Sequence, residues 1–349
     1  MLKTRVLLLP LVIILVASLL AIGCAPAAAP GEVIQLKYAD QNPETGWEGT
    51  HAAQPWTAQI EKATNGRVKI TGYYAQSLFK GVDAWQSLKS DVADIAWCFH
   101  GYWAGMTPLA DVLTLPFLPF KSAEQASGIF WQLMEKYPSM AKEFADNKVL
   151  VTYTSSPYLL ITTKKQVKTL EDLKGLKIRV TGGPPTEQMK LLGAIPQSIG
   201  MPDTYENLQK GVIDGMAIPW EALYSFRQYE VAKYWTIVPL HTVYFTQSMN
   251  LNSWNNLPAD VQKQVMSVCG LSGSKFWGKN MFDSAAAAAR DEIKKQGIQI
   301  SEYTLPQSEL DRWTQIAGKP LWDQWIADMK AKGMPEAEEI FNTTLDMIK

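Results

Sequence analysis

Cysteine and histidine are scarce in this sequence. The 349 residues include three of each, and His51, His100 and His241 lack the spacing of metal ligands. The chain also has no GxSxG, HExxH or P-loop motif, which mark esterases, metalloproteases and nucleotide-binding proteins. These absences argue against the conventional enzyme classes, and the sequence predicts neither a cofactor nor catalysis.

An excess of either charge is absent as well. The 33 lysines and arginines nearly balance the 34 aspartates and glutamates, for a formal net charge of -1. No global field therefore attracts nucleic acid, and any anion must be bound by local side chains. No internal repeat is visible, which argues against a solenoid. With 47% hydrophobic residues, the chain is long enough for a globular fold of two domains.

Residues 1–24 have the pattern of a bacterial lipoprotein signal peptide. Two basic residues precede an apolar run over residues 6–20, and a small residue stands directly before Cys24. Lipidation of Cys24 would anchor the protein to a membrane on the extracytoplasmic side, in the periplasm or at the cell surface, with residues 25–32 as a tether. Simple cleavage of the signal stays open. A retained transmembrane helix is disfavoured, because the apolar run is shorter than the ~20 residues that a span requires.

The other two cysteines, Cys98 and Cys269, lie far apart within apolar stretches. We expect two buried free thiols, and a disulfide between them is the alternative outside the cytoplasm. Neither state gives the cysteine pattern of a metal site.

Strand-like and helix-like segments alternate along the rest of the chain. Strands are predicted at 35–39 and 67–73 around an amphipathic helix at 50–64, and an apolar strand is predicted at 93–99. Two more strands are predicted within 149–163. This β-α-β rhythm predicts an α/β fold with parallel sheets.

The rhythm continues in the second half, with a strand predicted at 176–181. Asp283 or Ser284 is expected to cap a helix at 285–296. The C-terminal region is helical in pattern, and its tryptophans are expected to pack the helices down. These tryptophans are Trp313, Trp322 and Trp325.

Ligands of parallel sheets bind beyond the carboxyl ends of the strands. This rule places residues 41–42, 74–76 and 99–103 along one edge of the first sheet. The loops that follow these strands are therefore one candidate wall of a binding site.

Arg179 lies inside the otherwise apolar strand at 176–181, near its carboxyl end. A buried arginine is costly unless an anion pairs with it. The planar guanidinium can hold a carboxylate through two parallel hydrogen bonds, which fix the position and the orientation of the ligand. The alternative is a structural ion pair with an aspartate or glutamate. Arg179 is the strongest single candidate for binding an organic acid.

The run LKGLKIRV at 173–180 resembles the ligand-arginine strand of the DctP-type solute receptors of TRAP transporters. Further segments occur in the order of that family, namely NGRVKI at 65–70, ADI at 93–95, LPF at 115–117, YENLQKGVIDG at 205–215 and WNNLP at 254–258. No single motif is decisive, but together they extend over nearly the whole chain after the tether.

The resemblance implies a two-lobed periplasmic-binding-protein fold, type II-like, with strands that cross between two α/β lobes and a long C-terminal helix spanning both. Lobe I would comprise 33–155 plus 244–283, and lobe II 156–243 plus 284–349. The lobes would close on a small organic acid in the cleft, and the membrane subunits of the transporter would recognise the closed form. Such a receptor does not change its solute, so no enzymatic activity is expected.

The resemblance also bears on the choice of ligand. Receptors for longer acids often carry a second arginine before the first, and residues 155–160 contain none, so a dicarboxylate or sialic acid is disfavoured. Trp220 and Glu221 resemble the variant of monocarboxylate and keto-acid receptors, where the tryptophan packs on the ligand. The glutamate there meets a hydroxyl, an amine or a bound cation. The alternative for Glu221 is a solvated carboxylate at a helix start.

The remaining candidates for the ligand site are aromatic packing partners and hydrogen-bond partners. They are Phe99, Tyr102, Trp103 and Phe245 in the first group and Tyr74, Gln76, Tyr158 and Asn250 in the second. An arginine among many aromatics favours a partly hydrophobic monocarboxylate, such as a keto, hydroxy or aromatic acid.

Two other functions stay open from the sequence. An extracytoplasmic enzyme could hold a carboxylate substrate with Arg179 and use Glu221 as general base, but the neighbouring positions offer no second titratable group. A ligand-binding sensor would use the same binding chemistry as a transport receptor, and the sequence does not separate the two.

Overall fold

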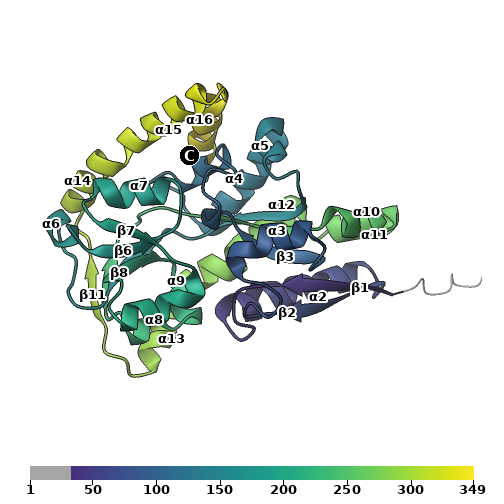
Figure 1. The fold of residues 1–349 in the computed structure, drawn as a ribbon, viewed down its shortest axis with the longest axis horizontal. Helices are drawn as coiled ribbons and strands as arrows, with labels where there is room; N and C mark the ends of the chain where they lie inside the picture. Colours follow the sequence, from purple (N-terminus) through teal and green to yellow (C-terminus); the bar gives the residue numbers. More distant parts are fainter. Residues whose placement is uncertain (1–32) are drawn as a thin grey trace, which may run out of the picture.

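The computed structural model describes residues 33–349, which form two α/β lobes, each built on its own β-sheet (Figure 1). The predicted signal peptide and tether, with Cys24, lie outside these described residues. No helix between residues 33 and 349 is long and apolar enough to cross a membrane.

The sheet of lobe I has five strands in the order β2-β1-β3-β10-β4. They are β1 (Ile34–Ala39), β2 (Val68–Tyr73), β3 (Ile95–Phe99), β4 (Lys148–Thr154) and β10 (Tyr244–Met249). β1 pairs in parallel with β2 and β3, as the β-α-β pattern predicts. β10 returns from lobe II and runs antiparallel between β3 and β4, buried along its whole length.

The sheet of lobe II has six strands in the order β11-β9-β5-β8-β6-β7. They are β5 (Leu159–Thr162), β6 (Lys177–Val180), β7 (Ile195–Ser198), β8 (Gly215–Ile218), β9 (Tyr234–Ile237) and β11 (Ser301–Thr304). β6 is parallel to β7 and β8, whereas β5 is antiparallel to β8 and β9. β6 carries Arg179, as the sequence predicts.

Two segments cross side by side between the sheets, one between β4 and β5 and one between β9 and β10. The backbone N–H of Ser155 donates to Val243 at 2.8 Å, and that of Tyr158 donates to His241 at 2.8 Å. The crossing strands implied by the resemblance are therefore present, and they join the two lobes.

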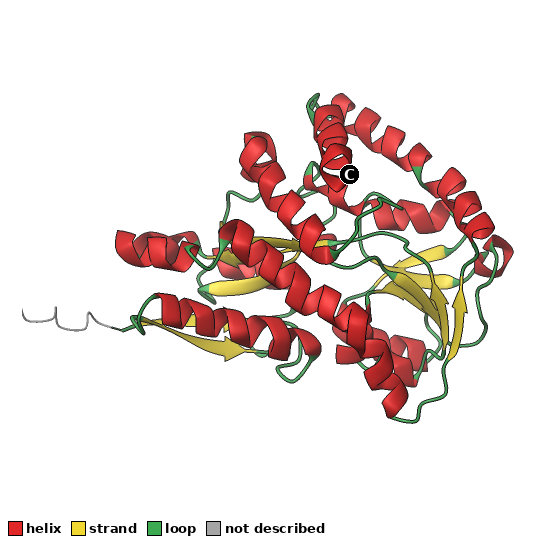
Figure 2. Ribbon diagram, turned by 180° about the vertical axis from the view of Figure 1, so that it is seen from behind, coloured by secondary structure: helices red, strands yellow, loops and turns green. Residues whose placement is uncertain are grey.

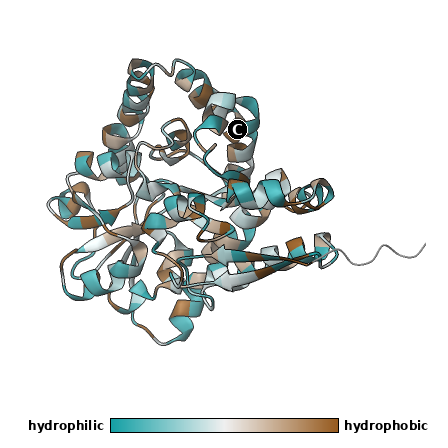
Figure 3. Cartoon of the chain, turned by 45° about the vertical axis from the view of Figure 1, so that its right-hand side comes forward, coloured by the Kyte–Doolittle hydropathy of each residue, from teal (hydrophilic) through white to brown (hydrophobic). Residues whose placement is uncertain are grey.

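Helices cover both sheets, and Figure 3 shows hydrophobic and hydrophilic residues mixed along them, the pattern of amphipathic helices packed on a core. Lobe I carries α2 (Gln54–Ala63), α3 (Ala84–Lys89), α4 (Ala123–Lys136), α5 (Pro138–Lys142), α10 (Leu251–Asn256), α11 (Ala259–Met266) and α12 (Gly270–Trp277). Lobe II carries α6 (Leu170–Leu173), α7 (Pro184–Leu191), α8 (Thr204–Gln209), α9 (Trp220–Ser225) and α13 (Ser284–Lys295).

A continuous helical segment crosses from lobe I to lobe II (Figure 2). It consists of α12, the π-helical segment η7 (Gly278–Asp283) and α13. The expected helix start at Asp283 or Ser284 is wrong, because the chain is already helical at both positions. The Asp283 carboxylate instead accepts hydrogen bonds from the backbone N–H groups of Ala123 and Glu124, at 2.8 and 2.9 Å. Asp283 therefore stabilises the start of α4 rather than that of its own helix.

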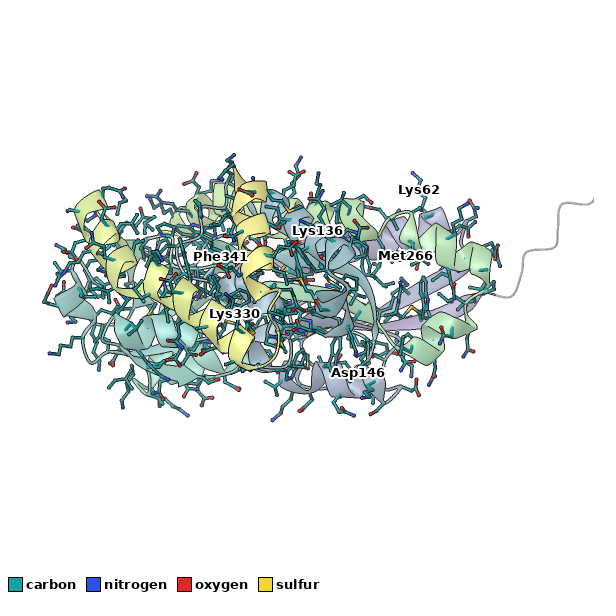
Figure 4. The ribbon with its side chains drawn as sticks, turned by 90° about the horizontal axis from the view of Figure 1, so that it is seen from above. Lys62, Lys136, Asp146, Met266, Lys330 and Phe341 are labelled. Atoms are coloured by element: carbon teal, nitrogen blue, oxygen red, sulfur yellow. The ribbon has the colours of Figure 1, made fainter. Side chains whose placement is uncertain are left out.

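Three further helices lead from lobe II back to lobe I, namely α14 (Gln307–Ala317), α15 (Lys319–Ala331) and α16 (Ala337–Ile348). Seen from above, they lie across the molecule toward α4 (Figure 4). Lys136 of α4 donates to the hydroxyl of Thr343 on α16 at 3.1 Å. The C-terminal connection between the lobes is thus made by three helices, and the single long segment is the preceding one.

The C-terminal tryptophans pack these helices onto the body, as expected. Trp313 and Trp325 are buried. The indole N–H of Trp322 donates to the carbonyl oxygen of Pro116 at 2.8 Å, and that of Trp325 donates to Pro108 at 3.1 Å. These bonds hold α15 against the loop that precedes α4.

Cys98 and Cys269 are both buried and free, which confirms the expectation of two free thiols. Burial raises the pKa of both, that of Cys269 to about 12. Neither sulfur is therefore a reactive thiolate at neutral pH.

Gly278 brings the crossing helical segment close to α4, and Gly278→Ala is expected to lower the free energy of unfolding by about 1–2 kcal/mol. A Cβ at this position would overlap the carbonyl oxygen of Ala123 and the hydroxyl of Ser127. Gly128→Ala is the matched control, because its Cβ would meet only the flexible side chain of Lys275 at 3.0 Å, with Leu271 at 3.7 Å. Urea unfolding compares the two variants, and equal stabilities would contradict the close packing.

Candidate ligand-binding site

A small cavity of about 20 Å³ lies between the two lobes, beyond the ends of β3 and β6. Most of its lining is apolar, contributed by Trp97, Phe99, Met201, Pro219, Ala222, Phe226, Phe245, Met281 and Phe282. Its polar lining consists of Gln41, Asn42, Tyr102, Tyr158, Arg179 and Glu221. The cavity therefore combines a large apolar surface with a few polar groups, as small-molecule sites do.

Arg179 has no exposed surface, and its Nε donates to the carbonyl oxygen of Ile199 at 2.9 Å. The other two guanidinium nitrogens, Nη1 and Nη2, are buried without a hydrogen-bond partner among residues 33–349. The structural ion pair that the sequence left open is thus absent from the described chain. Two fixed donors on one planar group match the two oxygens of a carboxylate.

The aromatic side of the cavity is built on β3, β10 and η7. The antiparallel register places Phe245 directly opposite Phe99, so both rings lie on the same face of the sheet. Their ring centroids are 4.9 Å apart, and the ring of Phe282 stacks on Phe245 at 5.5 Å. These rings rest on a fully paired sheet, which makes this wall rigid.

Hydroxyl groups join the lobes beside the cavity. The hydroxyl of Tyr102 donates to Gln41 Oε1 at 3.0 Å and accepts from the backbone N–H of Met201 at 3.1 Å. At a second place, the backbone N–H of Trp47 donates to Ser225 Oγ at 2.9 Å. These bonds hold the two lobes together in the arrangement seen here.

Glu221 is a buried carboxyl group at the start of α9, with 2% of its surface exposed. It accepts a hydrogen bond from the Ser225 hydroxyl at 2.7 Å. Burial raises the pKa of Glu221 to about 7, and the negative charge of Asp40 adds to this rise while the Ser225 hydroxyl opposes it. The alternative that the sequence left open for Glu221, a solvated carboxylate at a helix start, is therefore not what the structure contains.

Two further buried carboxyl groups interact electrostatically with Glu221. Asp40 accepts hydrogen bonds from the Tyr38 hydroxyl at 2.7 Å and from the backbone and side-chain amides of Asn42 at 2.8 and 2.9 Å. Glu48 is fully buried, and neither of its carboxyl oxygens has a donor among residues 33–349. Burial, followed by the charge of Asp40, raises the pKa of Glu48 well above its usual range. Burial raises the pKa of Asp40 as well, but the hydrogen bonds from Asn42 and Tyr38 oppose this rise, so Asp40 ionises more readily than Glu48.

The structure brings part of the sequence-predicted site together. Arg179, Glu221, Phe99, Tyr102, Tyr158 and Phe245 line the cavity. Burial raises the pKa of Tyr158, so its hydroxyl stays protonated and can donate. Trp220, Trp103, Tyr74, Gln76 and Asn250 do not line it.

Packing explains where two of these five residues lie. The ring of Trp220 meets that of Trp235 edge-on at 5.4 Å in the core of lobe II. Trp103 donates from Nε1 to the carbonyl oxygen of Val82 at 2.7 Å and packs in the lobe I core. Both partly buried indoles therefore pack against a core and do not line the cavity.

Local structure explains the other three. Asn250 accepts from the backbone N–H of Ser253 at 2.9 Å, and so caps α10. Gln76 accepts from the backbone N–H of Gly81 at 2.9 Å, which closes a turn. Tyr74 packs edge-on against Tyr38 at 6.0 Å.

Sequence reasoning missed several residues of the lining. Trp97 stands two positions before Phe99 on β3, so strand alternation would have placed both on the same face. Met281 and Phe282 lie in η7, just before the expected helix start, and no local pattern marks them. Gln41 and Asn42 were placed at this edge without a binding role.

Within residues 33–349, no group of three or more histidine, cysteine, aspartate or glutamate side chains is arranged to hold a metal ion. The cation that the resemblance allowed near Glu221 therefore has no such ligand group in this part of the chain.

The family model of the bacterial extracellular solute-binding proteins, family 7, matches residues 39–328. A TRAP solute-binding protein from Rhodoferax ferrireducens, solved with copurified benzoate, is 28% identical and superposes with a TM-score of 0.85, covering 90% of this chain and 98% of that one. A marine metagenome TRAP protein specific for aromatic acids, solved with 3-hydroxybenzoate, is also 28% identical, with a TM-score of 0.85 and coverage of 91% and 98%. A Bordetella bronchiseptica TRAP protein with bound mandelate is 26% identical, with a TM-score of 0.83 and coverage of 90% and 98%.

These matches extend over both lobes and confirm the resemblance seen in the sequence. The matched proteins are solute-binding proteins of uptake systems and not enzymes. The chain therefore belongs to family 7 of the bacterial extracellular solute-binding proteins, as a TRAP-type receptor.

Proposed function

We propose that this receptor binds a small, largely apolar monocarboxylate, with an aromatic acid as the favoured ligand. The observation that carries the proposal is the buried guanidinium of Arg179, whose Nη1 and Nη2 have no partner in residues 33–349. The carboxylate of a benzoate-like acid would accept from both nitrogens, while its ring would pack against Phe99, Phe245 and Phe282.

The polarity of the cavity supports a largely apolar ligand. Its free volume in this arrangement of the lobes is about 20 Å³, far below the ~300–1,000 Å³ of typical ligand pockets, so a bound acid must displace lining side chains or part the lobes. A sugar acid carries several hydroxyl groups, and an apolar lining would leave most of them without partners. A ring or short chain with one carboxylate fits this lining better.

The acidic groups beside the cavity disfavour a second carboxylate. Glu221 lines the cavity, and Asp40 and Glu48 are buried carboxyl groups that interact electrostatically with it. A dicarboxylate would bring a second negative charge toward the Asp40 carboxylate of this cluster, and such repulsion is a common means of rejecting a wrong ligand.

The solved relatives support the aromatic class. The Rhodoferax ferrireducens and marine metagenome proteins were solved with benzoate and 3-hydroxybenzoate, and the Bordetella bronchiseptica protein with mandelate. Each of these ligands combines one carboxylate with one benzene ring.

The lobes would close on the ligand, and the TRAP membrane subunits would then take it up. Arg179 on β6 recruits the carboxylate to lobe II, and the wall on β3 and β10 closes over the ring. The hydrogen bonds of Tyr102 and Ser225 between the lobes stabilise this closed state. Lipid anchoring through Cys24 and the residue limits of the lobes stay predictions.

The test is a binding screen with protein that has been unfolded and refolded to remove copurified solutes. Thermal shift and calorimetry are measured with benzoate, phenylacetate, mandelate, short aliphatic acids, keto acids, succinate and glucuronate. We expect the largest stabilisation from an aromatic monocarboxylate that is recovered chemically unchanged. Preferential binding of succinate or glucuronate would contradict the proposal, and conversion of a ligand would support the enzyme alternative.

A further inference from the structure

Trp97 lines the cavity from lobe I, and the binding scheme above gives it no role. It lies in the middle of β3, and its ring packs against those of Phe99 and Phe245 with centroid distances of 6.1 and 5.2 Å. Only 3% of its surface is exposed. The central strand and these rings hold the indole in one position.

The indole Nε1 of Trp97 is a buried donor without an acceptor among residues 33–349. Buried donors nearly always have a partner, because burying one unpaired costs free energy. Of the described side chains that line the cavity, only Arg179 shares this property. Trp97 and Arg179 are therefore the two described lining residues with buried donors left unused by the protein.

The two donors belong to different lobes. Arg179 lies on β6 in the sheet of lobe II, and Trp97 lies on β3 in the sheet of lobe I. A ligand that accepts from both bridges the lobes, so its binding free energy favours the closed arrangement.

We propose that Trp97 is a specificity-determining residue, whose indole N–H donates to an uncharged oxygen substituent of the ligand. The preferred solute is then a hydroxylated aromatic monocarboxylate. This inference rests on the proposed function, because it takes Arg179 as the carboxylate site. A hydroxyl substituent can both accept and donate hydrogen bonds. It can therefore accept from the Trp97 indole N–H and donate to the carboxyl group of Glu221, which lines the same cavity.

The experiment compares Trp97→Phe with Trp277→Phe. Phenylalanine keeps an aromatic ring and removes the indole donor. Trp277 is the matched control, because its Nε1 is equally buried and unpartnered in the described chain but does not line the cavity. Calorimetry gives the Kd of benzoate, the three hydroxybenzoates and the three methylbenzoates. The methyl group of a methylbenzoate is similar in size to the hydroxyl group but cannot accept a hydrogen bond.

We expect the unmodified protein to prefer at least one hydroxybenzoate over both benzoate and the corresponding methylbenzoate. Trp97→Phe should reduce this preference by about tenfold, the usual scale for one hydrogen bond, and leave benzoate affinity within a factor of about two. Trp277→Phe should leave the preference intact. An unchanged preference in Trp97→Phe, or an equal loss for benzoate and hydroxybenzoate, would overturn the inference.

A second measurement needs no variant of the binding site. In ¹⁵N-labelled protein, the indole N–H resonance of Trp97 should shift further downfield with the hydroxybenzoate than with the methylbenzoate, while that of Trp277 stays in place. Identical Trp97 shifts with both ligands would overturn the inference and leave the monocarboxylate proposal standing. Failure of every monocarboxylate to bind would instead remove the proposed function itself.

Discussion

Replacement of Arg179 by methionine is expected to abolish carboxylate binding, with a loss of affinity of at least about 100-fold. The guanidinium can give two charge-assisted hydrogen bonds to the carboxylate, each worth ~1.5–3 kcal/mol, and ~1.4 kcal/mol corresponds to a tenfold change in Kd. Methionine can fill much of the volume but donates nothing. Arg179→Lys should also bind weakly, because one ammonium group cannot reproduce the two parallel N–H donors.

Arg179→Met is not expected to destabilise the ligand-free protein. The guanidinium is buried with one backbone acceptor and with no carboxylate partner in the described chain, so its desolvation is poorly compensated. Calorimetry with the preferred acid and urea unfolding without it separate the two effects. Arg67→Met serves as control, since Arg67 pairs with Asp260 at the surface and should leave affinity unchanged. Retained affinity in folded Arg179→Met would show that the carboxylate binds elsewhere.

Much of the fold could be predicted because its signals are local. The strand that carries Arg179 stands out as an apolar run broken by one charge, and β1, α2 and β2 follow from periodicity. The family resemblance then supplied the lobes, which no local pattern shows. Asp283 marks the limit of this reasoning. Its position in the sequence suggests that it caps the helix that follows it, but its carboxylate caps α4 instead. Only tertiary packing decides which of these two helices it caps.

The site was less predictable, because it depends on which of many aromatic residues face one small cavity. Trp97 lies in the middle of β3 and Trp103 follows its end, and the sequence favoured Trp103. In the structure Trp97 lines the cavity, while the partly buried Trp103 packs against the lobe I core. β3 is apolar on both faces, so alternation of polar and apolar residues cannot tell which face meets the ligand. Glu48 gave no signal either, because nothing local distinguishes a buried carboxyl group from an exposed one.

Glu48→Gln is expected to stabilise the protein at alkaline pH and to flatten the pH dependence of its stability. Burial and the charge of Asp40 raise the pKa of Glu48 well above its usual 4.5, so the folded state keeps a proton that the unfolded state has lost. The free energy of unfolding therefore falls as the pH rises above 4.5, because the unfolded state binds fewer protons. Glutamine cannot ionise, and its amide N–H can donate to Asp40, so the part of this fall that Glu48 causes disappears, while the part due to Glu221 remains.

At pH 8 the variant should be more stable than the unmodified protein by about 2–3 kcal/mol, the scale of the penalty for a buried group without a partner. Near pH 4.5 the two should be nearly equal, because Glu48 is then protonated in the folded state. Urea unfolding of the variant and of the unmodified protein between pH 4.5 and 8 measures the difference in their free energies of unfolding. Glu44→Gln is the control, since Glu44 is exposed nearby and should not alter the pH profile. Loss of stability in Glu48→Gln at pH 8 would show that the Glu48 carboxylate is ionised in the folded protein and stabilised by its surroundings, which would reverse the charge assignment of the acidic cluster beside the ligand.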